Sequence, residues 1–189
     1  MGSESVVLSD RKRLAHLVKS TDQRRVIIDL VKKHGWRRGA EIGVLKGKTL
    51  FSVLDACPNL YMTGVDQWKV LPLRDDENAE TYSDFDMAAI ELDVCRKAVK
   101  YGGRCTIFKG DSASQARRVP DGSLDFVFID GDHTEAGVRR DIAAWAPKGR
   151  GGGMILGHDI SWSSVGRVVR ELFPDHVAYG EEVWGAVKS

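Results

Sequence analysis

Residues 38–49, with the sequence RGAEIGVLKGKT, constrain the fold more than any other stretch of this chain. An apolar run passes through Gly43 and Gly47 directly into a segment with helical spacing. The first glycine allows a sharp turn of the backbone beside a ligand, and the second lets a helix begin close to the preceding strand. The stretch therefore predicts a strand, a turn and a helix that together cradle a nucleotide-like ligand.

Glu41, just before the turn, narrows the class of ligand. Its carboxylate would repel a pyrophosphate, whereas it would attract an amino group or a positive charge. Two phosphate-binding patterns also fail on spacing. GxGxxG is absent, and the step from Gly43 to the run Gly47-Lys48-Thr49 is one residue short of GxxxxGK[ST].

Strand-like and helix-like segments alternate after residue 36, following two amphipathic segments that we expect to form lead-in helices within residues 1–35. This alternation predicts one domain over 1–189, with a core from 36 to 189. The expected fold class is α/β, a Rossmann-like doubly wound and mostly parallel sheet of seven strands with an antiparallel last strand, and helices on both faces. The expected strands lie near residues 38–43, 60–66, 105–108, 124–129, 154–156, 175–179 and 183–188, and helices near 47–57, from about Ser83, near 112–118 and after Asp132.

Composition excludes some classes of partner. The 28 basic and 27 acidic residues nearly cancel, which argues against nucleic acid or an anionic membrane as partner. No apolar run approaches ~18 residues, and the first residues lack the features of a signal peptide. Cys57, Cys95 and Cys105 lie outside any CxxC pattern and are expected to be reduced. We therefore expect a cytoplasmic protein whose partner is a small molecule, with a homodimer left open.

Acidic residues follow the expected strands at the edge where ligands bind in open α/β sheets. A nucleoside offers a ribose diol and an exocyclic amine, which are hydrogen-bond donors that carboxylates accept well. Asp66 suits the ribose diol. Asp111 suits the adenine amine, but it equally suits the N-cap of a helix beginning at Ser112, and both roles remain open.

Further along, the run FIDGDH at 128–133, the pattern Arg140-Asp141-Ile142, Trp145 and the run GHDI at 157–160 are similar to methyltransferase family 24. That family groups with macrocin-type and catechol-type O-methyltransferases, so the resemblance implies S-adenosylmethionine as cofactor, transfer of a methyl group to a hydroxyl, and often a divalent ion such as Mg²⁺. The residues that we expect to bind the cofactor are Glu41, Gly43, Gly47, Asp66, Gln67, Trp68, Asp111, Ser112 and Asp130.

A metal site is predicted where Asp130 and the pair His158-Asp159 follow neighbouring strands. Two carboxylates with water suit Mg²⁺, whereas the imidazole of His158 favours softer ions such as Mn²⁺, Fe²⁺ or Zn²⁺. Three alternatives stay open: His158 is a ligand of a softer ion, His158 faces the substrate beside Mg²⁺, or His158 is a base in a site without metal.

His133 is the second predicted catalytic residue. Asp132 and Glu135 match a capping box, which predicts a helix start at Asp132 and places His133 in the first turn. There the helix dipole would keep the imidazole neutral and able to accept a proton. In catechol-type enzymes the catalytic lysine falls at this position. The alternative is an exposed histidine at a helix start.

Other functions compete with catalysis of O-methylation. A non-catalytic S-adenosylmethionine-binding domain would need Glu41, Gly43 and Asp66 but not the histidines. Nucleic-acid methylation is disfavoured because the tetrapeptide [DNS]PP[YFW] and a Pro-Cys nucleophile are absent. A metal-dependent oxygenase would leave the cofactor cradle without purpose. The polar stretch 67–82 is typical of a lid or of a disordered loop, and a lid could also come from the N-terminal helices or another subunit. Trp68, Tyr82 and Trp162 are expected in loops that flank the same edge.

Overall fold

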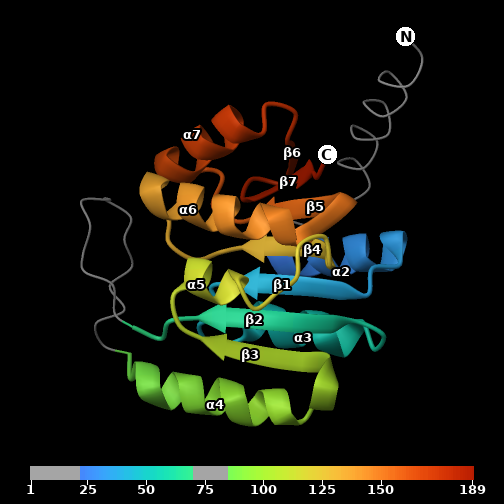
Figure 1. The fold of residues 1–189 in the computed structure, drawn as a ribbon, viewed down its shortest axis with the longest axis vertical. Coiled ribbons are helices and arrows are strands. Elements are labelled where there is room, and N and C mark those ends of the chain that lie inside the picture. Colours follow the sequence, from blue (N-terminus) through green and yellow to red (C-terminus); the bar gives the residue numbers. More distant parts are fainter. Residues whose placement is uncertain (1–21, 70–84) are drawn as a thin grey trace.

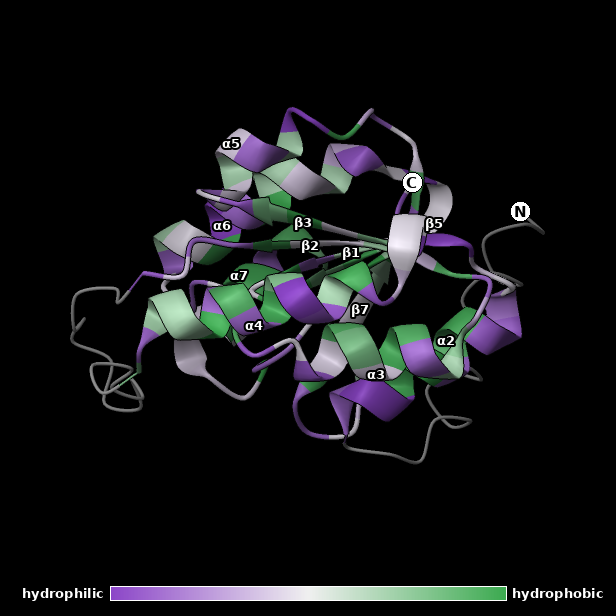
Figure 2. Ribbon diagram, turned by 90° about the horizontal axis from the view of Figure 1, so that it is seen from below, coloured by the Kyte–Doolittle hydropathy of each residue, from purple (hydrophilic) through white to green (hydrophobic). Residues whose placement is uncertain are grey.

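The protein folds into a central sheet with helices on both faces, as Figures 1 and 2 show. The computed structural model describes residues 22–69 and 85–189. The sheet has seven strands in the order β3-β2-β1-β4-β5-β7-β6. Helices α2, α3 and α4 cover one face, and α5, α6 and α7 cover the other. The predicted fold class is therefore confirmed.

The first five strands are parallel and the end of the chain reverses direction. β7 runs antiparallel to β5, and β6 pairs with β7 as the predicted hairpin. Each crossover between parallel strands passes over a face of the sheet through a helix, which is why both faces are covered. The strands are β1 (Arg38–Ile42), β2 (Tyr61–Asp66), β3 (Cys105–Lys109), β4 (Leu124–Ile129), β5 (Gly149–Gly157), β6 (Val177–Tyr179) and β7 (Val183–Val187).

The helices match the predicted segments, with differences at their starts. The stretch expected to begin a helix near Ser83 is helical only from Met87, because the Asp86 side chain accepts a hydrogen bond from Ala89 N and caps the helix there. The first lead-in helix and most of the stretch 67–82 fall outside the described residues. The helices are α2 (Gln23–His34), α3 (Lys48–Ala56), α4 (Met87–Val99), α5 (Ser112–Ala116), α6 (Glu135–Trp145) and α7 (Ser163–Leu172).

Two apolar layers hold the sheet between its helices. Successive side chains of β1 and β4 point to opposite faces of the sheet and so belong to different layers. Ala40 and Val127 lie in the layer under α6 and α7, whereas Phe126 and Phe128 lie in the layer under α2 and α3. Cys57 and Cys105 are buried, Cys95 is half-buried, and all three are free thiols, as predicted. In the described part of the chain, no helix has the length and apolar character needed to cross a membrane.

Backbone hydrogen bonds continue one residue past the ends of the central strands. Gly43 N donates to Val65 O at 2.9 Å, and Asp130 N donates to Ile42 O at 2.8 Å. In the same way His158 N donates to Ile129 O at 3.1 Å. The residues that follow β1, β4 and β5 are thus fixed side by side at the carboxyl edge of the sheet.

Replacing Gly43 with alanine is expected to destabilise the protein by about 3 kcal/mol or more. Gly43 has φ +91°, and an added Cβ would meet the carbonyl oxygen and carbon of Asp130. Gly122→Ala is a matched control, because Gly122 has φ +67° but nothing within 4 Å of an added Cβ. Thermal denaturation should show a much larger fall in Tm for Gly43→Ala, and equal falls would contradict this account of the turn.

Candidate active site

The turn after β1 is held by the carboxylate of Asp66, at the end of β2. Asp66 Oδ2 accepts from Val44 N at 2.9 Å and Leu45 N at 2.8 Å, and Oδ1 accepts from Trp68 N at 2.7 Å. A carboxylate has about four lone-pair sites. Asp66 therefore shapes the cradle itself and keeps one acceptor site, on Oδ1, for a ligand hydroxyl.

Backbone strain is concentrated at this edge of the sheet. Leu45, Trp68 and Asp159 have φ values of 43°, 46° and 57°, and they are the non-glycine residues with positive φ in the described part of the chain. Residues held in this region cost about 1–3 kcal/mol each and tend to cluster at functional sites. Trp68 is buried, and its indole N–H donates a hydrogen bond to Leu45 O at 2.9 Å. This bond stabilises the turn.

Glu41 is a buried carboxyl beneath the cradle. It is 2% exposed, and its Oε2 has no hydrogen-bond partner among the described residues. Burial raises the pKa of Glu41 well above its ordinary value, and the charges of Asp130 and Asp66 raise it further. Oε2 of Glu41 is therefore a buried acceptor that could receive a hydrogen bond from a donor group of a ligand.

Replacing Glu41 with glutamine is expected to raise the Tm of the ligand-free protein at pH 8 and to leave it nearly unchanged near pH 4. Because the folded pKa exceeds the unfolded one, the carboxyl contributes its full stability below the unfolded pKa and loses it as pH rises through the folded pKa. Denaturation scans across this range, with exposed Glu181→Gln as control, measure the effect. A Tm difference that does not change with pH would contradict it.

Gly47 and Gln67 complete the predicted cradle. Gly47, with φ +69°, is the N-cap residue of α3, and an added Cβ would meet the Phe51 ring at 2.4 Å. Gln67 is half-buried beside Asp66. Both lie at the carboxyl edge, where they were predicted.

Two residues at this edge were not predicted. Gln23, the first residue of α2, donates from Nε2 to Thr49 Oγ1 at 2.8 Å and to Asp130 Oδ2 at 3.1 Å. Thr49 is buried in the first turn of α3. The position of Thr49 after the two glycines was a usable signal in the sequence, but nothing local indicates that Gln23 reaches across to Asp130.

Asp111 and Ser112 lie after β3, and the structure shows the capping role that had been left open. Asp111 Oδ1 accepts from Ser114 N at 3.0 Å, and its Oδ2 lies 3.8 Å from Arg140 Nη2. The Ser114 amide and hydroxyl, together with Arg140, outweigh burial and lower the pKa of Asp111. Ser112 is buried, and its hydroxyl donates to Asp141 Oδ1 at 2.5 Å.

Asp130, His133 and Asp159 form a group of potential metal ligands. One ligand atom from each lies within 4.8 Å of the other two. His133 Nε2 is 2.9 Å from Asp159 Oδ2 and 3.7 Å from Asp130 Oδ1, yet this buried nitrogen has no aligned hydrogen-bond partner among the described residues. Two carboxylates and a ring nitrogen this close together suit a cation bound between them.

His158 lies beside this group. Its Nδ1 is 3.0 Å from Asp159 Oδ1 and 3.9 Å from Asp130 Oδ1. Burial lowers the pKa of His158, but Asp159 and Asp130 outweigh burial and raise it overall. The structure thus brings together all the predicted ligands, and it groups His133 rather than His158 with the two carboxylates.

The predicted start of the helix after β4 is wrong. Thr134 is the N-cap of α6, its side chain accepting from Gly137 N, while Asp132 accepts from Thr134 N in the preceding turn. His133 therefore lies before the helix, outside its first turn. Burial lowers the pKa of His133, but the neighbouring carboxylates Asp130 and Asp159 overcome this and raise it to about 10. The expectation of a neutral imidazole does not hold for the metal-free chain.

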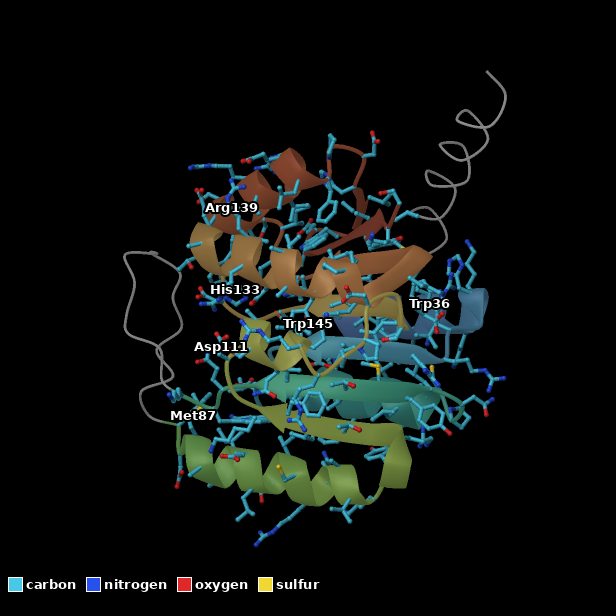
Figure 3. The ribbon with its side chains drawn as sticks, viewed as in Figure 1. Trp36, Met87, Asp111, His133, Arg139 and Trp145 are labelled. Carbon is cyan, nitrogen blue, oxygen red and sulfur yellow. The ribbon has the colours of Figure 1, made fainter. Side chains whose placement is uncertain are left out.

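Aromatic rings enclose one side of this group. The Trp162 ring, just before α7, lies 4.8 Å from the His133 ring at an interplanar angle of 51°. Figure 3 shows His133 and Asp111 at the same edge of the molecule, with Trp36 at the opposite edge. The metal-ligand group lies at the same edge of the sheet as the cradle, where the backbone at Gly43 passes against Asp130.

Three comparisons with known proteins bear on this site. A family model described as a methyltransferase domain matches residues 40–160, which is more than half of the chain. No curated protein sequence matches. Solved structures share the fold at low sequence identity, and the three described next match over nearly the whole of both chains.

A candidate caffeoyl-CoA O-methyltransferase from Staphylococcus aureus is 13% identical with a TM-score of 0.62, covering 100% of this chain and 93% of the other. A candidate O-methyltransferase from Klebsiella pneumoniae is 15% identical with a TM-score of 0.60, covering 97% and 90%. A Podospora anserina methyltransferase with bound S-adenosylhomocysteine is 13% identical with a TM-score of 0.62, covering 96% and 88%. From the match of the family model and the fold, the chain belongs to methyltransferase family 24, with the class I methyltransferase architecture.

Proposed function

We propose that this protein is an S-adenosylmethionine-dependent methyltransferase that transfers a methyl group to a hydroxyl of a small molecule, with a divalent ion bound by Asp130, His133 and Asp159. The observation that carries the proposal is the buried His133 Nε2, which faces two carboxylates and has no aligned hydrogen bond. This group lies at the same edge as the cradle of Gly43 and Asp66. A methyl donor and a hydroxyl could therefore meet there.

The residues of the cradle fit S-adenosylmethionine. The unpartnered Oε2 of Glu41 would accept from the amino group of the cofactor, and the remaining acceptor site of Asp66 would bind the ribose diol. Gly43 lets the turn pass against the carbonyl group of Asp130, where a side chain would collide. When bound, the cofactor supplies an electrophilic methyl group on a sulfonium. Trp68, buried beneath the turn, would help to hold these contacts in place.

The carboxylates and His133 suit a hydroxyl acceptor. In the metal-free chain His133 holds a proton at neutral pH, so it cannot accept one from a substrate. A bound ion would neutralise Asp130 and Asp159 and remove the cause of the raised pKa. His158, next to Asp159, would then be free to take the proton of the acceptor. This disfavours the alternative of a metal-independent enzyme with His133 as base.

The structural neighbours named as O-methyltransferases support a hydroxyl acceptor. A second candidate function is a non-catalytic S-adenosylmethionine-binding domain, which would use Glu41 and Asp66 alone. Two histidines and two carboxylates lie together at this edge, and bringing such groups partly out of water costs stability. A catalytic role would explain why the protein keeps them there, so this cluster favours catalysis.

An acceptor screen tests the proposal. Purified protein, S-adenosylmethionine and Mg²⁺ or Mn²⁺ are incubated with catechols, other phenols and sugars, and release of S-adenosylhomocysteine is measured. We expect turnover with at least one hydroxyl acceptor. Asp159→Asn should abolish this turnover while S-adenosylhomocysteine still binds. Binding of S-adenosylhomocysteine without turnover on any acceptor would instead support the binding-domain function.

A further inference from the structure

Asp141, in the middle of α6, is a buried carboxylate with no part in the chemistry described so far. It is 2% exposed and faces the apolar layer between α6 and the sheet. Its Oδ1 accepts the hydroxyl of Ser112 at 2.5 Å. The indole of Trp145, one turn further along α6, donates to Ser112 O at 3.2 Å. Figure 3 shows Trp145 between α6 and α5, where these contacts lie.

The other oxygen of Asp141 lies against the segment after β4. A Cβ added to Gly131 would be 3.3 Å from Asp141 Oδ2, so the backbone of Gly131 passes directly beside this oxygen. The carboxylate of Asp141 therefore bonds to the residue that begins α5, and its second oxygen lies near the residue that follows Asp130. Asp111 and Ser112 on one side, and Asp130 on the other, are positions where we place the cofactor.

Packing alone does not account for a charge at this position. Burial raises the pKa of Asp141 to about 6, although Ser112 and Arg140 act against it. An apolar side chain of the same volume would cost less in this layer than a carboxyl group does. Its Oδ1 is 4.0 Å from Arg140 Nε, too far for a hydrogen bond. A buried, directional acceptor of this kind fixes the orientation of the groups that it contacts.

We propose that Asp141 is a positioning residue that holds Ser112 at the start of α5 and so sets the shape of the adenine end of the cofactor site. The inference rests on the proposed cofactor site and extends it to a residue that does not touch the cofactor. Among the described residues, the side chain of Asp141 makes no hydrogen bond or ion pair with the metal ligands Asp130, His133 and Asp159, so their side chains do not depend on it directly.

Calorimetric titration of Asp141→Asn tests the inference. The three ligands are S-adenosylhomocysteine, 5′-methylthioadenosine and Mn²⁺. Of the two nucleosides, 5′-methylthioadenosine retains adenine and ribose but lacks the amino acid. We expect both nucleosides to bind about tenfold more weakly, by a similar factor, and Mn²⁺ to bind as in the wild type. Ser112→Ala should give the same pattern. The double variant should be no weaker than either single variant, because the two side chains act through one contact.

The exposed Asp93→Asn is the matched control, and Tm is measured for every variant. A lower Tm with unchanged nucleoside affinity would show a purely structural role and overturn the inference. Equal losses for the nucleosides and Mn²⁺ would overturn it as well. If Asp141→Asn does not fold, Ser112→Ala tests the same contact. If the wild-type protein binds neither nucleoside, the proposed function is overturned, and this inference with it. If the wild type binds them and both variants bind them equally well, the inference alone is overturned.

Discussion

Replacing Asp66 with alanine is expected to weaken binding of S-adenosylhomocysteine at least about 100-fold. Each hydrogen bond to an ionised carboxylate contributes about 1.5–3 kcal/mol. Asp66 would lose its bond to the ribose diol, and the Val44 and Leu45 amides would lose the acceptor that orders the turn. Calorimetric titration measures the change, with exposed Asp93→Ala as control. Equal affinity in wild type and Asp66→Ala would contradict the assignment of Asp66 to the cofactor.

Two ligands separate the ribose contact from the ordering of the turn. Adenosine carries the diol, and 2′,3′-dideoxyadenosine lacks it. If Asp66 binds the diol, the wild type should prefer adenosine and Asp66→Ala should show little preference, because the two losses remove the same contact. If Asp66 acts only through the turn, the preference for adenosine should survive in Asp66→Ala.

Binding of Mn²⁺ is expected to strengthen about tenfold for each pH unit between pH 6 and pH 9. The pKa of His133 is raised to about 10 in the metal-free chain, so an ion that binds Nε2 must displace a proton over this whole range. Asp159 needs no such exchange, because its two histidine neighbours outweigh burial and lower its pKa. Titration of the protein with Mn²⁺ at several pH values, after treatment with a chelator, measures the slope.

Two histidine variants decide which imidazole is the ligand. His133→Gln should bind Mn²⁺ weakly and with little dependence on pH, whereas His158→Gln should retain most of the affinity and the slope. The reverse result would restore His158 as the ligand predicted from the sequence. Asp130→Asn and Asp159→Asn should both lose the ion, and methyl transfer that persists in these variants would show that no metal is needed.

Much of the fold could be predicted because each strand carries its own signal. The run Leu124–Ile129 is apolar apart from Asp125, and it forms β4, which lies between β1 and β5 in the sheet and is covered by helices on both faces. Once the strands are placed, the rule that ligands bind at the carboxyl edge brings Asp66, Asp130 and Asp159 together without further information. The prediction that β4 and β5 are neighbours is confirmed.

Details that depend on competing local interactions could not be predicted in the same way. Asp132 and Thr134 both suit an N-cap, and only the path of the chain after β4 decides that Thr134 has this role. The pKa of His133 depends on Asp159, which lies 26 residues later in the chain. The contact of Gln23 with Asp130 depends on how α2 packs against α3, and no periodicity in the sequence encodes it.

The order of strands also determines when this site can exist during folding. β1 lies between β2 and β4, and β4 needs β5 as its other neighbour, so the edge forms only after the chain as far as Gly157 has joined the sheet. Partly folded chains then lack a cofactor site, and the cofactor would bind only the native state. Its full binding free energy adds to global stability, by about 2.7 kcal/mol at a ligand concentration of about 100 times Kd. Cellular cofactor levels would thus influence how much folded protein accumulates.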